Sequence, residues 1–99
     1  MEMNRTALVT GAARGIGRGI SLALARDGYT VAAVGTRPSD DEAVAAYVRE
    51  LQTVSPASFY VPADISTDEG RAAIVREAFA GLGHLDVLVN NAGDRKSIV

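Results

Sequence analysis

The stretch that decides the fold is Thr10-Gly11-Ala12-Ala13-Arg14-Gly15-Ile16-Gly17, which follows the apolar run Ala7-Leu8-Val9 and precedes a helix-like run. Gly11 allows the chain to turn sharply out of a strand, and a position without a side chain lets a phosphate approach the backbone. A helix that begins after such a loop presents unpaired N–H groups and the positive end of its dipole to the phosphate. The pattern therefore predicts a pyrophosphate-binding loop, the alternative being a tight strand–helix turn without a ligand.

A second string, Asn90-Asn91-Ala92-Gly93, follows another apolar run, Val87-Leu88-Val89. The spacing G-x-x-x-G-x-G after the first run and N-N-A-G after the second together resemble the short-chain dehydrogenase/reductase family, over about Arg5 to Gly93. The letters T-G-A-A-R-G-I-G are most similar to the 3-oxoacyl-[acyl-carrier-protein] reductase type. The resemblance implies a Rossmann fold and the transfer of a hydride between NADP(H) and a carbonyl or alcohol substrate.

The order of the apolar runs predicts strands that alternate with helices. Strands are expected at Thr6–Thr10, Thr30–Gly35, Ser58–Val61 and Asp86–Asn90. The second is a continuous apolar run, which is typical of a parallel strand covered on both faces. This alternation predicts the α/β class: a doubly wound parallel sheet (Rossmann) of the form β-α-β-α-β-α-β, N-terminal portion only, with strand order 3-2-1-4.

The segments between these strands have helical periodicity. In the first helix, the buried stripe is expected at Ile16, Ile20, Ala23 and Leu24, and Gly28 is expected to end it. Capping-box spacing predicts that the second helix begins within Ser39–Glu42 and the third within Ser66–Glu69. Their apolar stripes are Val44, Tyr47, Val48 and Leu51 in the second, and Ile74, Val75, Ala78, Phe79 and Leu82 in the third, which Gly81 and Gly83 are expected to end.

Residues 1–93 are therefore interpreted as an incomplete dinucleotide-binding Rossmann domain. Residues 94–99 continue no visible pattern, and are either a tail or a truncated continuation. The last strand would normally have a further neighbour, and the apolar edge of Val87–Val89 is a pairing hazard without one. We therefore expect poor solubility or self-association of the 99-residue chain.

Composition narrows the function classes further. The chain has 99 residues, of which 47% are hydrophobic and 22% charged, and it carries a net charge of −2. This charge provides no basic field for nucleic acid or an anionic membrane. No apolar run approaches the roughly 18 residues of a membrane span, and the N-terminus lacks the apolar core of a signal peptide, so a cytoplasmic location is expected. The absence of cysteine excludes thiol chemistry, and the single histidine, His84, is expected in a turn far from the ligand edge of the sheet. No metal site is predicted.

The end of the second strand bears on the choice of cofactor. An acidic residue there would accept both ribose hydroxyls of NAD and repel a 2′-phosphate, but the sequence reads Gly35-Thr36-Arg37 with no carboxylate before Asp40. Arg37 could pair with the phosphate, and Arg14 with the same group or the pyrophosphate, although either could also be a solvated surface residue. NADP(H) is therefore favoured over NAD(H).

The resemblance extends the candidate site. It implies that Asp64 accepts from the adenine amine and that Ile65 covers the adenine, although Asp64 could instead shape the turn before the third helix. It also implies that Asn90 lies beside the cofactor while Asn91 braces the sheet. The predicted cofactor-binding residues are Gly11, Arg14, Gly15, Ile16, Gly17, Thr36, Arg37, Asp64, Ile65, Asn90, Ala92 and Gly93.

The catalytic groups of the family are not in this sequence. The resemblance implies a serine and a Tyr-x-x-x-Lys pair beyond N-N-A-G, yet none of Tyr29, Tyr47 and Tyr60 has a lysine four residues later. Lys96 is the only lysine, and Ala92 stands four residues before it. The chain is therefore interpreted as the NADP-binding N-terminal fragment of a short-chain dehydrogenase/reductase that is inactive alone and whose parent is a homo-oligomer. The alternative is a stand-alone nucleotide-binding or regulatory module.

Overall fold

The computed structural model describes residues 4–91, which form one parallel sheet covered by helices. The elements are β1 (Arg5–Thr10), α1 (Gly15–Arg26), β2 (Tyr29–Gly35), α2 (Glu42–Val54), β3 (Phe59–Pro62), α3 (Asp68–Leu82) and β4 (Val87–Asn90). The strand order is β3-β2-β1-β4 and every pairing is parallel. The predicted architecture is thereby confirmed, with each strand starting within one residue of its expected position.

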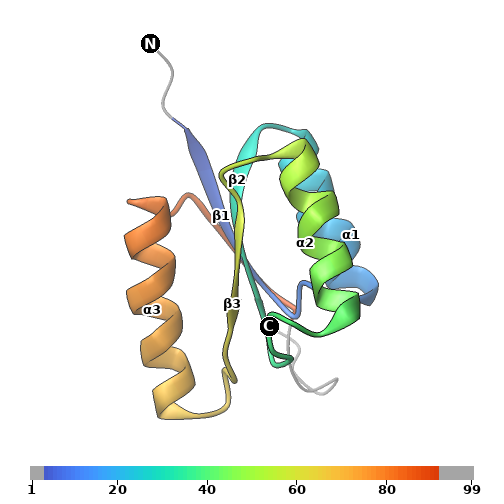
Figure 1. The fold of residues 1–99 in the computed structure, drawn as a ribbon. Coiled ribbons are helices and arrows are strands. Elements are labelled where there is room, and N and C mark those ends of the chain that lie inside the picture. Colours follow the sequence, from blue (N-terminus) through green and yellow to red (C-terminus); the bar gives the residue numbers. More distant parts are fainter. Residues whose placement is uncertain (1–3, 92–99) are drawn as a thin grey trace.

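The helices cover the two faces of the sheet unequally (Figure 1). Helices α1 and α2 lie together on one face, and α3 lies on the other. Strand β2 contributes to both layers because its side chains alternate: Val31 and Ala33 join the cluster under α1 and α2, whereas Ala32 and Val34 join the cluster under α3. The continuous apolar run of β2 is thus buried on both sides, as the sequence predicts.

The predicted buried stripe of α1 is wrong at Ile16 and Ala23, whereas Leu24 is partly buried and packs against the core. Ile16 is 73% exposed and Ala23 is exposed, whereas the buried residues of the helix are Gly17, Ser21, Leu22 and Ala25. The stripe is shifted because Gly17 packs directly on the Gly11 carbonyl, and this backbone contact sets the rotation of the helix.

Helices α2 and α3 begin within the predicted ranges, but neither is capped by the serine that opens the capping-box pattern. The α2 cap is Asp41, whose Oδ1 accepts from the backbone N–H groups of Ala43 and Val44. The α3 cap is Thr67, whose Oγ1 accepts from the Gly70 N–H. A short polar side chain further along each capping box can reach the free N–H groups equally well, so the motif fixes the location but not the capping residue.

Helix α3 buries less than its sequence stripe predicts. Ile74 and Ala78 are buried, but Val75 and Phe79 are 59% and 45% exposed. Gly81 does not end the helix: it lies inside it, where the Phe59 ring occupies the space that a Cβ would fill. The α2 stripe, in contrast, is packed as predicted, with Val44, Tyr47 and Leu51 buried and Val48 partly buried.

The amino edge of the sheet is closed by hydrogen bonds. The Thr6 N–H donates to Asp86 Oδ2 over 2.8 Å, and Thr6 Oγ1 donates to the His84 carbonyl over 2.7 Å. His84 Nε2 lies 2.9 Å from the Asn4 carbonyl oxygen and 3.1 Å from Asp86 Oδ2. His84 therefore belongs to a turn at the edge opposite the glycine loop, as expected, and is half-buried there.

Candidate functional site

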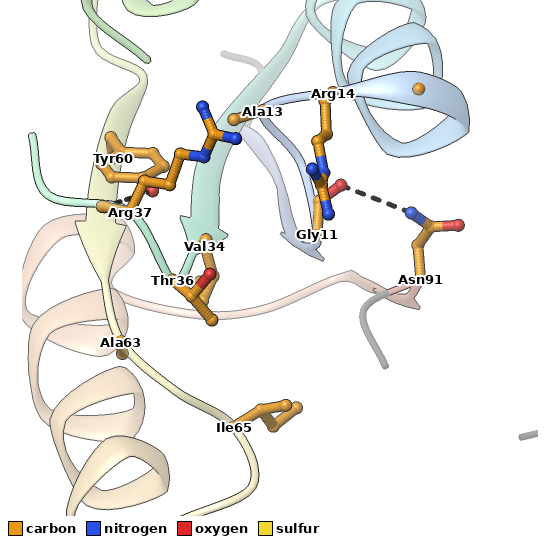
Figure 2. Close-up of a pocket in the computed structure, with 12 residues that line it drawn as sticks. Gly11, Ala13, Arg14, Val34, Thr36, Arg37, Tyr60, Ala63, Ile65 and Asn91 are labelled. Atoms are coloured by element: carbon orange, nitrogen blue, oxygen red, sulfur yellow. Dashed lines mark hydrogen bonds between the residues drawn. The ribbon is translucent and has the colours of Figure 1, made fainter. Parts of the chain in front are cut away.

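A hollow of about 450 Å³ lies at the carboxyl ends of β1, β2 and β3 (Figure 2). In a doubly wound sheet, ligands bind at this edge because the loops that follow the strands leave a crevice there. The residues that line it are Gly11, Ala13, Arg14, Gly15, Val34, Gly35, Thr36, Arg37, Tyr60, Ala63, Ile65 and Asn91.

The glycine loop gives the hollow a wall made of backbone. Gly11 and Gly15 have φ angles of +62° and +61°, a region that side-chain-bearing residues rarely adopt. A Cβ on Gly15 would meet no atom within 4 Å, whereas one on Gly17 would lie 1.9 Å from the Gly11 carbonyl oxygen. The loop is also tied to β2, because the Ala12 N–H donates to the Val34 carbonyl over 3.0 Å. The glycines thus hold the start of α1 against β1 and leave open space beside Gly15.

The start of α1 differs electrostatically from the other helix starts in residues 4–91. Its N-cap residue is Arg14, which has extended backbone angles and makes no side-chain capping bond, and its first turn holds no acidic residue. The first turns of α2 and α3 hold acidic residues and are capped by Asp41 and Thr67. The N–H groups and positive dipole end of α1 therefore remain available to an anion at the hollow.

The end of β2 places a second arginine at the hollow. Arg37 Nη1 lies 3.5 Å from Asp41 Oδ2, and the Tyr60 hydroxyl donates to the Arg37 carbonyl over 2.8 Å. Burial, followed by the nearby Asp41 charge, raises the pKa of Tyr60 above its usual value, so its hydroxyl stays protonated and can donate. Both Arg14 and Arg37 line the hollow, and no acidic residue within 4–91 lines it.

The two asparagines at the end of β4 have different surroundings. Asn90 Oδ1 accepts from Thr10 Oγ1 over 3.2 Å, and Asn90 does not line the hollow. Asn91 does line it, while its Nδ2 donates to the Gly11 carbonyl over 3.3 Å and its N–H donates to Thr10 Oγ1 (Figure 2). Asn91 therefore braces the glycine loop, whereas the sequence predicts that it braces the sheet. It also forms part of the wall of the hollow, beside which the sequence predicts Asn90.

Asp64 shapes the turn before α3. Its Oδ1 accepts from the Ser66 hydroxyl over 2.7 Å and from the Ser66 N–H over 2.9 Å, and these bonds lower the pKa of the carboxyl. Asp64 is exposed and does not line the hollow, whereas the neighbouring Ile65 does. The turn-shaping alternative for Asp64 is thus present in the structure, and its contact with an adenine stays a prediction.

The structure brings together part of the predicted site. Of the predicted residues, those that line the hollow are Gly11, Arg14, Gly15, Thr36, Arg37 and Ile65, whereas Ile16, Gly17, Asp64 and Asn90 do not line it. Ala92 and Gly93 lie outside the described residues. Lining residues that the sequence interpretation missed include Ala13, Val34, Tyr60 and Ala63. Tyr60 could have been found from its place in β3, because the strand next to β2 must end at the same edge.

Comparison with known proteins agrees with this geometry. The family model described as short chain dehydrogenase matches residues 5–98. The chain belongs to the short-chain dehydrogenase family. Dehydrogenases of this kind carry the hydride on a nicotinamide cofactor bound by a Rossmann fold.

Individual relatives cover most of this chain but only part of their own length. The 3-oxoacyl-[acyl-carrier-protein] reductase of Staphylococcus aureus is 43% identical over 93 residues, which are 94% of this chain and 37% of the reductase. A putative short-chain dehydrogenase/reductase from Sinorhizobium meliloti matches with a TM-score of 0.84 and 38% identity, covering 95% of this chain and 42% of that one. The L-sorbose reductase of Gluconobacter frateurii, solved with NADPH and L-sorbose, matches with a TM-score of 0.81 and 29% identity over 92% of this chain and 34% of that one. The chain thus spans little more than a third of the curated relatives it matches first.

Neither a membrane span nor a metal cluster is found in the described part of the chain. None of the helices within residues 4–91 combines the length and apolar character that crossing a bilayer requires. In the same residues, no group of three or more His, Cys, Asp or Glu side chains is placed to hold a metal ion.

Proposed function

We propose that residues 1–93 form the NADP-binding N-terminal part of a short-chain dehydrogenase/reductase that transfers a hydride between NADP(H) and a carbonyl or alcohol substrate. The observation that carries the proposal is the hollow at the carboxyl edge, where an uncapped helix start and two arginines meet and no acidic residue of the described part of the chain lines the space. An anionic dinucleotide matches this charge, and the reductases among the relatives match the reaction class.

The residues present fit the cofactor. The positive φ at Gly15 and the empty space over its Cα leave room for a phosphate beside the first N–H groups of α1. Arg14 and Arg37 stand beyond the ends of β1 and β2, so one dinucleotide can contact both. Ile65 and Ala63 add an apolar surface for the adenine. When bound, the cofactor supplies the hydride at its nicotinamide ring.

The chain's own role in the reaction is binding and orientation. Holding the dinucleotide fixes one reactant, but a proton donor and a substrate pocket are also needed for turnover. The 99 residues contain no Tyr-x-x-x-Lys pair, and His84 lies at the opposite edge of the sheet. We therefore expect no reductase turnover by this chain with 3-oxoacyl thioesters, ketones or quinones.

The stand-alone module is the second candidate, and the exposed apolar surface of α3 and β4 disfavours it. Val75, Phe79 and Leu88 are all substantially exposed apolar side chains, and the outer edge of β4 has no paired strand within the described residues. A self-sufficient module would be expected to cover such surface. We therefore propose that the chain is part of a longer protein, in which further residues cover α3 and the outer edge of β4 and contribute the catalytic groups.

Titration calorimetry of the 99-residue chain with NADPH and NADH tests the binding proposal. We expect NADPH to bind more tightly, and we expect Arg37→Asp to reverse the order, by about tenfold in the affinity ratio, because a positive partner is replaced by a repulsive one. Arg49→Asp makes the same charge change on the exposed side of α2 and should leave the ratio unchanged. Absence of binding by either dinucleotide would refute the proposed function, and equal affinities that Arg37→Asp leaves equal would refute the NADP preference.

A further inference from the structure

Tyr60 connects β3 to the loop that follows β2. In the sheet, Tyr60 is paired in register with Ala33, two residues before Gly35. Its hydroxyl nevertheless reaches the Arg37 carbonyl, to which it donates over 2.8 Å. The side chain therefore runs alongside the last residues of β2 and ends at the loop that carries Arg37 (Figure 2).

Gly35 is the residue that the Tyr60 ring passes. A Cβ on Gly35 would lie 2.6 Å from the Tyr60 hydroxyl oxygen and 3.3 Å from two ring carbons. The absence of a side chain at Gly35 is thus what allows the hydroxyl to reach the next residues of the loop. Together, the ring contact and the hydrogen bond fix the backbone of residues 35–37 from the neighbouring strand.

The two ends of Arg37 are held by different partners. Tyr60 fixes its carbonyl, whereas its guanidinium is 3.5 Å from Asp41 and its side chain is 52% exposed. Asp41 is itself fixed, because its other carboxylate oxygen caps α2. An exposed ion pair at this distance is weak, and the guanidinium can exchange Asp41 for another anion. The hydrogen bond from Tyr60 to the Arg37 carbonyl is therefore the stronger restraint on the position of the Arg37 backbone.

We infer that Tyr60 is a positioning residue for cofactor selectivity: it holds the 35–37 segment so that Arg37 faces the 2′-phosphate of the dinucleotide. This inference rests on the proposed NADP binding and adds the residue through which Arg37 acts. Tyr60 contributes to the affinity difference between 2′-phosphorylated and unphosphorylated ligands rather than to the affinity they share.

The test uses two fragments of the cofactor, adenosine 2′,5′-bisphosphate and adenosine 5′-monophosphate, titrated into the 99-residue chain by calorimetry. Tyr60→Phe removes only the hydroxyl and keeps the ring against Gly35. We expect it to weaken the bisphosphate by about fivefold, the loss of roughly one net hydrogen bond, and to leave the monophosphate nearly unchanged. In Gly35→Ala, the added methyl group displaces the Tyr60 hydroxyl. This variant should also lower the ratio of bisphosphate affinity to monophosphate affinity. Adding Gly35→Ala to Tyr60→Phe should lower that affinity ratio little further.

Tyr47→Phe is the matched control. The Tyr47 hydroxyl donates to Ser21 Oγ over 2.6 Å between α2 and α1, and Tyr47 does not line the hollow. Its removal should lower the melting temperature without moving the affinity ratio, which separates positioning from general stability. An unchanged ratio in Tyr60→Phe, or an equal change in Tyr47→Phe, overturns the inference while the proposed function stands. A wild-type chain that binds neither fragment overturns the proposed function, and the inference with it.

Discussion

The starts of α1 and α3 have the same close backbone contact. The third residue of each helix is a glycine, Gly17 or Gly70, that lies against the carbonyl of the residue six positions earlier. A Cβ would come within 1.9 Å of the Gly11 oxygen in the first case and 1.8 Å of the Asp64 oxygen in the second. Both helices are therefore held against the loops that precede them by contacts that only glycine permits.

The two starts differ in what satisfies their free N–H groups. At α3, Thr67 accepts from Gly70, and Asp68 and Glu69 place negative charge in the first turn. At α1, Arg14 provides no capping bond, and its first turn holds no acidic residue. Since a capping side chain contributes about 1 kcal/mol to stability, α1 lacks a stabilisation that α3 has. The glycine contact is thus structural at the starts of both helices. The missing cap distinguishes the start of α1, where we propose that the anion binds.

Adding a methyl group at the shared contact gives the largest expected effect. We expect Gly17→Ala and Gly70→Ala each to lower the free energy of unfolding by about 3 kcal/mol, because the obstructing atom is a backbone oxygen that cannot rotate away. Gly19 lies in α1 with no atom within 4 Å of the place that a methyl group would take, so Gly19→Ala should raise stability by up to about 1 kcal/mol. Urea unfolding of the three variants measures this. A harmless Gly70→Ala beside a disruptive Gly17→Ala would show that the two contacts are not equivalent.

Giving α1 the cap that it lacks should separate stability from binding. The extended backbone of Arg14 suits an N-cap residue. Arg14→Asp should therefore raise the free energy of unfolding by about 1 kcal/mol. The same change should weaken NADPH binding by about a hundredfold, because a carboxylate then occupies the N–H groups and repels the phosphates.

Two variants serve as controls for the Arg14 substitution. Arg14→Asn supplies a cap without a negative charge and should weaken binding less than Arg14→Asp. Arg49→Asp repeats the charge change on α2 and should alter neither quantity appreciably. If Arg14→Asp left NADPH affinity unchanged, the uncapped start of α1 would have no part in binding. Calorimetric titration and urea unfolding provide the two readouts.

Removing the cap from α3 is the reciprocal change. Thr67→Ala should lower the free energy of unfolding by about 1 kcal/mol, through the lost bond to Gly70. Thr67→Ser keeps a hydroxyl and should recover most of that loss. A stability loss in Thr67→Ser as large as in Thr67→Ala would assign the effect to the missing methyl group rather than to the cap.

The sequence predicts the fold well because the fold follows from patterns that repeat along the chain. Alternating apolar runs and turns determine the strands, and the parallel order follows from the crossovers between them. The stripe of α1 could not be predicted from periodicity, because Gly17 has no side chain to register as apolar, yet it is the residue that sets the rotation of the helix. Val75 and Phe79 are exposed for another reason. An apolar stripe predicts that a helix face packs against something, but it does not say whether the surface that covers it lies within the described residues.

The site is predictable where it depends on backbone geometry. Gly11 and Gly15 are identified by the loop spacing, and Arg37 by its place after β2. Tyr60 and Asn91 required the three-dimensional arrangement, because each acts across a strand pairing on a residue far away in sequence. The N-N-A-G string marks Asn91, and the place of Tyr60 in β3 marks Tyr60, but neither signal gives the residue that the side chain contacts, which the pairing of the strands reveals.

The smallest expected difference between the starts of α1 and α3 is in how the free energy of unfolding depends on pH at low pH. The Ser66 hydroxyl and N–H donate to Asp64 Oδ1 and lower the pKa of that carboxyl below its ordinary 3.8, whereas the equivalent residue before α1 is Gly11, which cannot titrate. A carboxyl with a lowered pKa stabilises the fold above its unfolded pKa, and this contribution is lost as the pH falls through the folded value. Between about pH 5 and about pH 2, the wild-type chain should therefore lose slightly more stability than Asp64→Asn, which keeps an acceptor but no charge. Identical slopes for the wild-type chain and Asp64→Asn would show that the Ser66 bonds do not stabilise the ionised form of Asp64.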